Sequence, residues 1–135
     1  CLAGENDKCF WFYDTGFIFN EAPVPEGVLL IKIVSDYSGR ELKTGERVLP
    51  ENEFTNLKAA FELLDGLELS IEQVKIENLE IKEAVVKVSG GPEIYFSILV
   101  DPRFGKSVVE KLRSSGEWSQ IRYLDLRVQN KAFYQ

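Results

Sequence analysis

Apolar residues repeat with a period of two in the middle of the chain and with helical spacing on either side of it. Over residues 71–100 apolar side chains occupy about every second position, which is typical of half-buried strands. A Gly-Gly-Pro turn at 90–92 divides this region. The pattern predicts three consecutive strands over residues 74–79, 84–88 and 93–100.

A first helix is predicted after residue 49. Pro50 fits the first helical position, the first turn is acidic, as the helix dipole favours, and Gly66 fits the end. Its expected buried stripe, with spacings of three and four, consists of Phe54, Leu57, Phe61 and Leu64.

A second helix is predicted after residue 100. Asp101 fits the N-cap, Pro102 fits the first helical position and Gly116 fits the end. The expected apolar face of this helix consists of Phe104, Val108 and Leu112.

The N-terminal part of the chain is expected to form strands and loops. The run CFWFYDTGFIFN breaks at the turn signal of residues 14–16, which predicts a β-hairpin. The continuous apolar run of residues 28–34 has the length of a strand buried on both faces, so we expect a central strand there. Residues 35–47 show no periodicity and are expected to cross the surface.

The last fifteen residues, IRYLDLRVQNKAFYQ, are interpreted as two strands joined by a turn or bulge at 129–131, or as one long strand. Side chains alternate between the faces of a strand. The face expected to pack carries Leu124, Leu126 and Val128. The face expected to recognise a partner carries Tyr123, Asp125 and Arg127.

The order of elements predicts one α+β domain over residues 1–135. It is a hairpin, a strand, a helix, a three-stranded meander, a helix and the last strands. We expect a mixed, mainly antiparallel sheet with two helices packed on one face and the last strand or strands at the sheet edge.

Composition and charge narrow the class of protein. The 135 residues are 44% hydrophobic and 28% charged, and no apolar run reaches the roughly 20 residues that cross a bilayer. The net charge is −6 and the basic residues are scattered, so a nucleic-acid partner is not expected. The chain has no methionine, which predicts that the native initiator lies outside these residues.

The chain has no histidine, which removes the commonest general base and the Ser-His and Cys-His nucleophile pairs. Carboxylate pairs such as Glu51 with Glu53 are not placed to converge on a cleft, and residues 5–7 lack the spacing of a calcium loop. The glycine pair at 90–91 leads into a strand and is interpreted as a turn, not as a phosphate cradle. We therefore expect neither an enzyme nor a bound metal or cofactor.

The two cysteines, Cys1 and Cys9, flank a Gly-, Asn- and Asp-containing stretch that resembles a hairpin tip. A disulfide across it would close a short loop, contribute about 2 kcal/mol and indicate an oxidising, extracytoplasmic compartment. The alternative is a pair of free thiols.

Six aromatic residues gather in the predicted hairpin, and they could line a ligand groove. The preferred interpretation places half of them in the core by alternation, while the others pack against a preceding region or the neighbouring sheet. These residues are Phe10, Trp11, Phe12, Tyr13, Phe17 and Phe19.

Asp125 and Arg127 allow two interpretations. They could steady the sheet as a pair on one face or as cross-strand partners, contributing at most about 1 kcal/mol if exposed. Alternatively, Arg127 is held available for an acidic side chain of a partner whose backbone extends the sheet beyond residues 132–134.

The block GEWSQIRYLDLRVQNKAFYQ, after a helix bearing KSVVEKLRS, resembles the end of the extracytoplasmic β domain of the FtsQ/DivIB cell-division proteins. The earlier CFWFYDTGFIFNEAPVPEG resembles the opening of that domain. Together the two blocks span nearly the whole chain in order. Two departures are Val128, where some members have an aromatic residue, and the Tyr134-Gln135 ending, where many have glycine and tryptophan.

The resemblance implies a non-enzymatic scaffold of the bacterial divisome. Such a parent protein has a short cytoplasmic tail, one transmembrane helix and a POTRA domain before the β domain, which lies on the extracytoplasmic face of the membrane at the division septum. It docks FtsB/DivIC-type and FtsL-type partners by strand addition at the last strand. By this resemblance Arg127 would engage an acidic partner residue, and the edge would comprise Val128, Asn130, Ala132, Phe133 and Tyr134, beside Tyr123 and Asp125.

A function of another class remains open. The chain could be an exported domain that binds a glycan or a peptide in the aromatic region from Phe10 to Phe19. It would then present a concave pocket lined by those rings, whereas the scaffold would present an exposed strand edge at residues 132–134.

Overall fold

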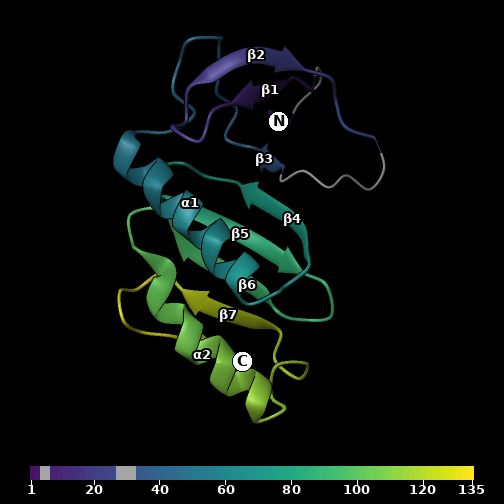
Figure 1. Cartoon of the computed structure of the whole chain (residues 1–135), viewed down its shortest axis with the longest axis vertical. Coiled ribbons are helices and arrows are strands. Elements are labelled where there is room, and N and C mark those ends of the chain that lie inside the picture. The colour runs from purple at the N-terminus through teal and green to yellow at the C-terminus, as the bar shows by residue number, and fades with distance from the viewer. Residues whose placement is uncertain (4–6, 27–32) are drawn as a thin grey trace.

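The computed structural model describes residues 1–3, 7–26 and 33–135 (Figure 1). In chain order the elements are β1 (Cys9–Phe12), β2 (Ile18–Ala22), β3 (Val34–Asp36), α1 (Glu51–Gly66), β4 (Ile71–Ile76), β5 (Glu83–Val88), β6 (Glu93–Ser97), the 3₁₀ helix η1 (Pro102–Phe104), α2 (Gly105–Ser114), β7 (Tyr123–Leu126) and β8 (Phe133–Tyr134).

Six strands form one mixed sheet in the order β3-β4-β5-β6-β7-β8. The β3–β4 and β6–β7 pairs are parallel, and the other three pairs are antiparallel. Strands β1 and β2 form a separate antiparallel hairpin, as the turn signal predicted. The α+β class, the meander and the edge position of the last strand are confirmed.

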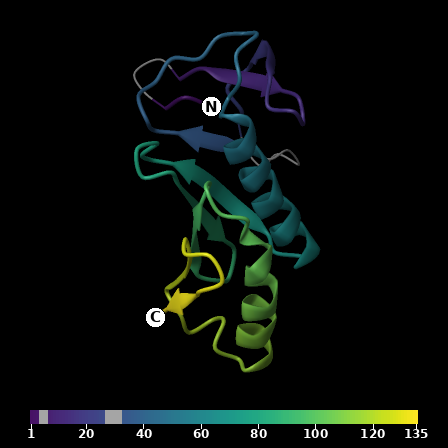
Figure 2. The ribbon, with the colours of Figure 1, turned by 90° about the vertical axis from the view of Figure 1, so that its left-hand side faces the viewer.

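Both helices lie on the same side of the six-stranded sheet (Figure 2). Their apolar stripes and the alternate apolar positions of the strands meet in the core. Its main cluster includes Leu63 and Leu64 of α1, Val109 and Leu112 of α2, and Val86, Ile94, Phe96, Leu124 and Leu126 of the sheet.

The helix boundaries follow the predicted signals with small shifts. Pro50 is the N-cap residue of α1, not its first helical residue, and Gly66 ends that helix. The carboxylate of Asp101 caps η1 by accepting from the backbone N–H of Arg103. In α2 the fully buried valine is Val109, not the predicted Val108.

The predicted strand over residues 28–34 falls mainly outside the described residues. Its last residue begins β3, which lies at the end of the strand order instead of the centre. The reason is that β3 pairs with β4 on one side only, while on the other side Leu2 forms a parallel bridge to Asp36.

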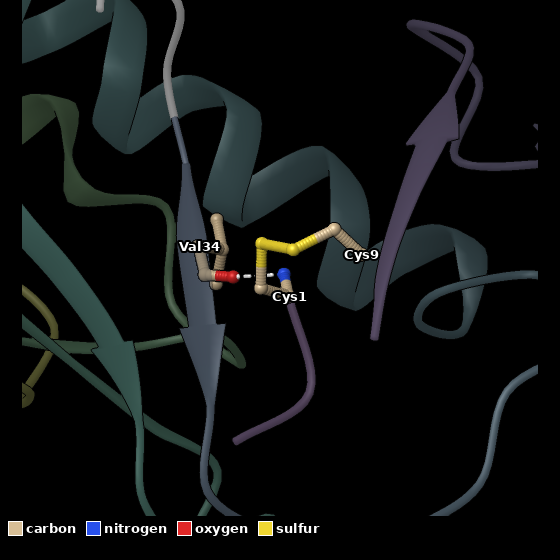
Figure 3. The surroundings of a disulfide bond; sticks show 3 residues. All are labelled: Cys1, Cys9 and Val34. Carbon is tan, nitrogen blue, oxygen red and sulfur yellow. Dashed lines mark hydrogen bonds between the residues drawn. A yellow bond between two sulfur atoms is a disulfide. The ribbon is translucent and has the colours of Figure 1, made fainter. Parts of the chain in front are cut away.

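The N-terminal segment lies along the outer edge of β3 (Figure 3). Cys1 and Cys9 form a disulfide there, as one of the two sequence interpretations predicted. The backbone nitrogen of Cys1 donates to the Val34 oxygen at 2.6 Å. Backbone N–H groups of Asp36 and Ala3 donate to the oxygens of Cys1 and Asp36 at 2.7 and 2.8 Å. Because Cys1 is bonded to Cys9 of β1, the disulfide ties this edge to the hairpin.

Removing the disulfide is expected to lower the stability of the domain. The bond closes a loop with a sequence separation of 8, and so short a loop corresponds to about 2 kcal/mol of lost unfolded-state entropy. We expect urea unfolding of a variant with Cys1→Ser and Cys9→Ser to give a free energy of unfolding lower by about that amount. Identical unfolding midpoints with and without the bond would contradict this expectation.

Candidate docking edge

Strand β7 is buried in the core and is joined to β8 by a turn. Leu124 and Leu126 of β7 are almost fully buried in the core, beside β6. After β7 the chain turns back, with Asn130 at a φ of 58° and the N–H of Lys131 donating to the Val128 oxygen at 3.0 Å. Asparagine tolerates this left-handed conformation better than most residues. The last fifteen residues therefore form two strands joined by a turn, which is one of the two interpretations of the sequence, and not one long strand.

The hydrogen-bond register decides which groups of β8 face outward. Tyr123 and Gln135 exchange backbone hydrogen bonds, both at 3.4 Å, and Asp125 is paired with Phe133. In an antiparallel ladder, residues with both groups directed at the partner strand alternate with residues whose groups point away. The N–H and C=O of Phe133 therefore point toward β7, while those of Tyr134 point away from it.

The carbonyl of Ala132 shares a planar peptide with the N–H of Phe133, which points toward β7, so this carbonyl points away from β7. On the described residues, this side of β8 has no neighbouring strand in the sheet. The β3 edge differs, because the N-terminal segment bonds to it. The outer side of β8 is thus a short exposed row of backbone donors and acceptors, the feature that permits strand addition.

The side chains of β8 point to opposite faces of the sheet. Phe133 lies opposite Asp125 and so shares the face that the helices leave open, whereas Tyr134 lies opposite Leu124 and shares the helix-covered face. They are 53% and 47% exposed. Ala132 is partly buried and packs against the main core cluster. A strand added here would meet an aromatic ring on each face.

Arg127 is engaged by two carboxylates of its own chain. Its Nε and Nη2 donate to the two oxygens of Asp125 at 2.9 and 2.6 Å, and its Nη1 donates to Glu83 of β5 at 2.5 Å. Its guanidinium carbon also lies 5.3 Å from the centre of the Tyr95 ring. Hydrogen bonding from Arg127 lowers the pKa of Asp125, and the bonds to Asp125 and Glu83 raise the pKa of Arg127.

These contacts favour the structural interpretation of the Asp125–Arg127 pair. The guanidinium reaches over β6 toward β5, in the direction opposite to β8. Strands in a sheet are spaced about 4.8 Å apart, so a strand added beyond β8 would lie roughly 10 Å from β7 on the other side. The two carboxylates already exceed the single positive charge of Arg127.

The lowered pKa of Asp125 predicts a pH dependence. Its pKa is below the ordinary value of about 3.9 in the unfolded chain, so the ionised carboxylate favours the folded state. This contribution is complete above the unfolded pKa and is lost as the pH falls through the lower folded pKa. We expect hydrogen exchange at the amide of Phe133, corrected for intrinsic rates, to accelerate below about pH 4 more in the native protein than in an Asp125→Asn variant.

The remaining predicted edge residues lie in the turn. Val128 was expected to pack with the two leucines, but it is 47% exposed. The reason is that β7 ends at Leu126, so the alternation of faces does not continue to residue 128. Asn130 shapes the turn by its backbone conformation.

The hairpin aromatics are more exposed than predicted. The rings of Trp11, Phe12, Tyr13, Phe17 and Phe19 are all exposed, and Phe10 is partly buried. The expectation that half of them belong to the core is therefore wrong. The hairpin side chains that are buried are those of Cys9 and Ile18. The aromatic rings are exposed because β1 and β2 form a sheet of their own, separate from the six-stranded one (Figure 1).

A groove of about 400 Å³ lies between this hairpin and α1. Most of its lining is apolar, with Phe12 meeting Phe54 edge to face at 5.9 Å. The described lining includes Phe10, Trp11, Phe12, Phe54, Leu57 and Phe61.

Three residues that act at the docking edge were not predicted from the sequence. Gln135 completes the β7–β8 ladder, and Glu83 and Tyr95 hold Arg127 from β5 and β6. Period-two alternation places Tyr95 on the face opposite the apolar positions of its strand, which was a usable signal. No sequence pattern pairs Glu83 with Arg127.

Within residues 1–3, 7–26 and 33–135, no cluster of three or more acidic or cysteine side chains is arranged to hold a metal ion. Neither described helix has the length and hydropathy to cross a membrane. A scan against models of protein families and a search of curated proteins both found no match.

Proposed function

We propose that the chain is the extracytoplasmic β domain of a FtsQ/DivIB-type division scaffold. In this role it docks FtsB/DivIC-type and FtsL-type partners by strand addition to the outer side of β8 during septum formation, and it carries out no catalysis. The observation that carries the proposal is the outward carbonyl of Ala132 and the outward backbone of Tyr134, on an edge that no described strand covers. The other end of the described sheet is covered by the N-terminal segment.

Charge supports an acidic partner segment. The stretch from Asp101 to Gln135 carries seven Lys and Arg residues against four Asp and Glu residues, although the whole chain has a net charge of −6. Complementary charge raises the association rate and suppresses wrong partners. The disulfide supports the extracytoplasmic location, because such bonds persist in oxidising compartments.

The proposal is tested by calorimetric titration with a synthetic peptide covering the membrane-distal end of the FtsB/DivIC-type protein encoded in the same genome. We expect saturable one-to-one binding that weakens as the salt concentration rises. A scrambled peptide of the same composition is the control. Equal binding of both peptides, or no heat at saturating concentrations, would contradict the proposal.

A second candidate function is supported by the groove between the hairpin and α1. Its mainly apolar lining, with aromatic rings from β1 and α1, fits an apolar peptide better than a glycan, which needs many polar partners. Under this alternative the partner binds against Phe10 and Phe12 and leaves β8 unchanged. The two candidates therefore predict protection of different strands.

A further inference from the structure

Arg127 links three neighbouring strands at the point where the chain leaves β7. Its guanidinium bonds to Asp125 of β7, lies over Tyr95 of β6 and reaches Glu83 of β5. The side chain of Glu83 is largely buried, so this contact is partly shielded from water. The backbone N–H of Arg127 also donates to the Asp125 carboxylate at 3.0 Å. Both the side chain and the backbone at the start of the turn are fixed.

The strand that follows is short and lies at the edge of the described sheet. Strand β8 consists of two residues, β7 is its one partner among the described strands, and both of its side chains are about half exposed. Such short segments open locally at low free-energy cost. The turn over residues 127–132 joins β7 to β8, and Arg127 is the first residue after β7.

We infer that Glu83 and Arg127 are positioning residues for the docking edge. By fixing the start of the turn against β5 and β6, they keep β8 in register with β7 and keep the carbonyl of Ala132 and the backbone of Tyr134 directed outward. The consequence for partner binding rests on the proposed function, but the effect on β8 itself does not. Glu83 lies on β5, two strands away from β7 on the side opposite to β8, so it acts on the edge without contacting an added strand.

Hydrogen exchange measured residue by residue tests this inference on the free domain. In Glu83→Ala we expect the protection of the Phe133 and Gln135 amides to fall by about threefold to tenfold, the scale of one partly exposed ion pair. Amides of the central strands, such as that of Ile94, should keep their protection. Glu83→Gln retains an acceptor oxygen and should lie between the native protein and the alanine variant.

Lys87→Met is the matched control. Lys87 pairs with Glu72 at 3.3 Å in an exposed ion pair of the six-stranded sheet, and the two residues lie on β5 and β4, neither of which is next to β7 or β8. This variant should leave the exchange of Phe133 and Gln135 unchanged. Unchanged exchange at these two amides in Glu83→Ala would overturn the inference, as would an equal loss of protection throughout the domain.

A binding measurement distinguishes positioning from competition. If the native domain binds the peptide of the proposed function, Glu83→Ala should bind it more weakly. Tighter binding would instead make Glu83 an internal competitor for a partner carboxylate at Arg127, and would overturn the positioning role. If the native domain does not bind the peptide, the proposed function fails, while the exchange comparison still decides the role of Glu83.

Discussion

Replacing Leu126 with aspartate is expected to unfold the domain. Leu126 is 1% exposed and lies in the main core cluster, between the sheet and α2. The packing there is tight, since a Cβ added at Gly105 would lie 2.6 Å from the Leu126 Cδ1 atom. Loss of a buried leucine costs about 2–5 kcal/mol, and burying even a neutral polar group without a hydrogen-bond partner costs about 2–7 kcal/mol more. Together these costs approach the 5–15 kcal/mol by which a typical domain is stable.

The measurement is urea unfolding followed by near-ultraviolet circular dichroism. We expect Leu126→Asp to show no cooperative transition, and Arg127→Met, one residue away, to keep a transition close to that of the native domain. Arg127→Glu, which the partner-contact interpretation suggests, is less informative because it adds a third carboxylate beside Asp125 and Glu83. A native-like transition for Leu126→Asp would contradict the core position of Leu126.

Replacing Tyr134 with proline is expected to abolish strand addition while leaving the domain folded. The N–H of Tyr134 points away from β7, so its loss removes a donor to the added strand and no bond within the sheet. The proline ring also obstructs the approach of a neighbouring strand. We expect peptide affinity to fall by at least about tenfold, the scale of one backbone hydrogen bond plus the steric cost. Calorimetric titration measures the affinity.

Two variants separate the backbone effect from other causes. Tyr134→Ala removes the ring but keeps the N–H, and should retain measurable binding. Phe133→Pro removes a donor that faces β7, so it should loosen β8 in the free domain. The register therefore makes Tyr134, and not Phe133, the position at which a proline tests strand addition. Equal affinities for native protein and Tyr134→Pro would exclude backbone pairing at this edge.

Much of the fold is encoded locally, which is why it could be predicted. Spacings of three and four defined α1 from Phe54 to Leu64, and alternation together with the 90–92 turn defined the meander. The shift from Val108 to Val109 has a local cause, because α2 follows a 3₁₀ turn. A 3₁₀ helix has three residues per turn instead of 3.6, so η1 rotates the buried face of the α2 helix that follows it.

The candidate site was less predictable because it depends on contacts distant in sequence. Alternation placed Tyr123, Asp125 and Arg127 on one face, but the contact from Arg127 to Glu83 spans 44 residues. The exposure of the hairpin aromatics had the same origin. Alternation tells which side chains share a face, and only the tertiary arrangement determines whether that face is covered.

The most direct test of strand addition is hydrogen exchange of the domain with and without the FtsB/DivIC-type peptide. We predict new protection concentrated between Val128 and Tyr134 and strongest at the outward amide of Tyr134. Unchanged exchange across this segment at saturating peptide, with new protection on β1 and β2 instead, would contradict docking at β8 and would favour the groove beside the aromatic hairpin.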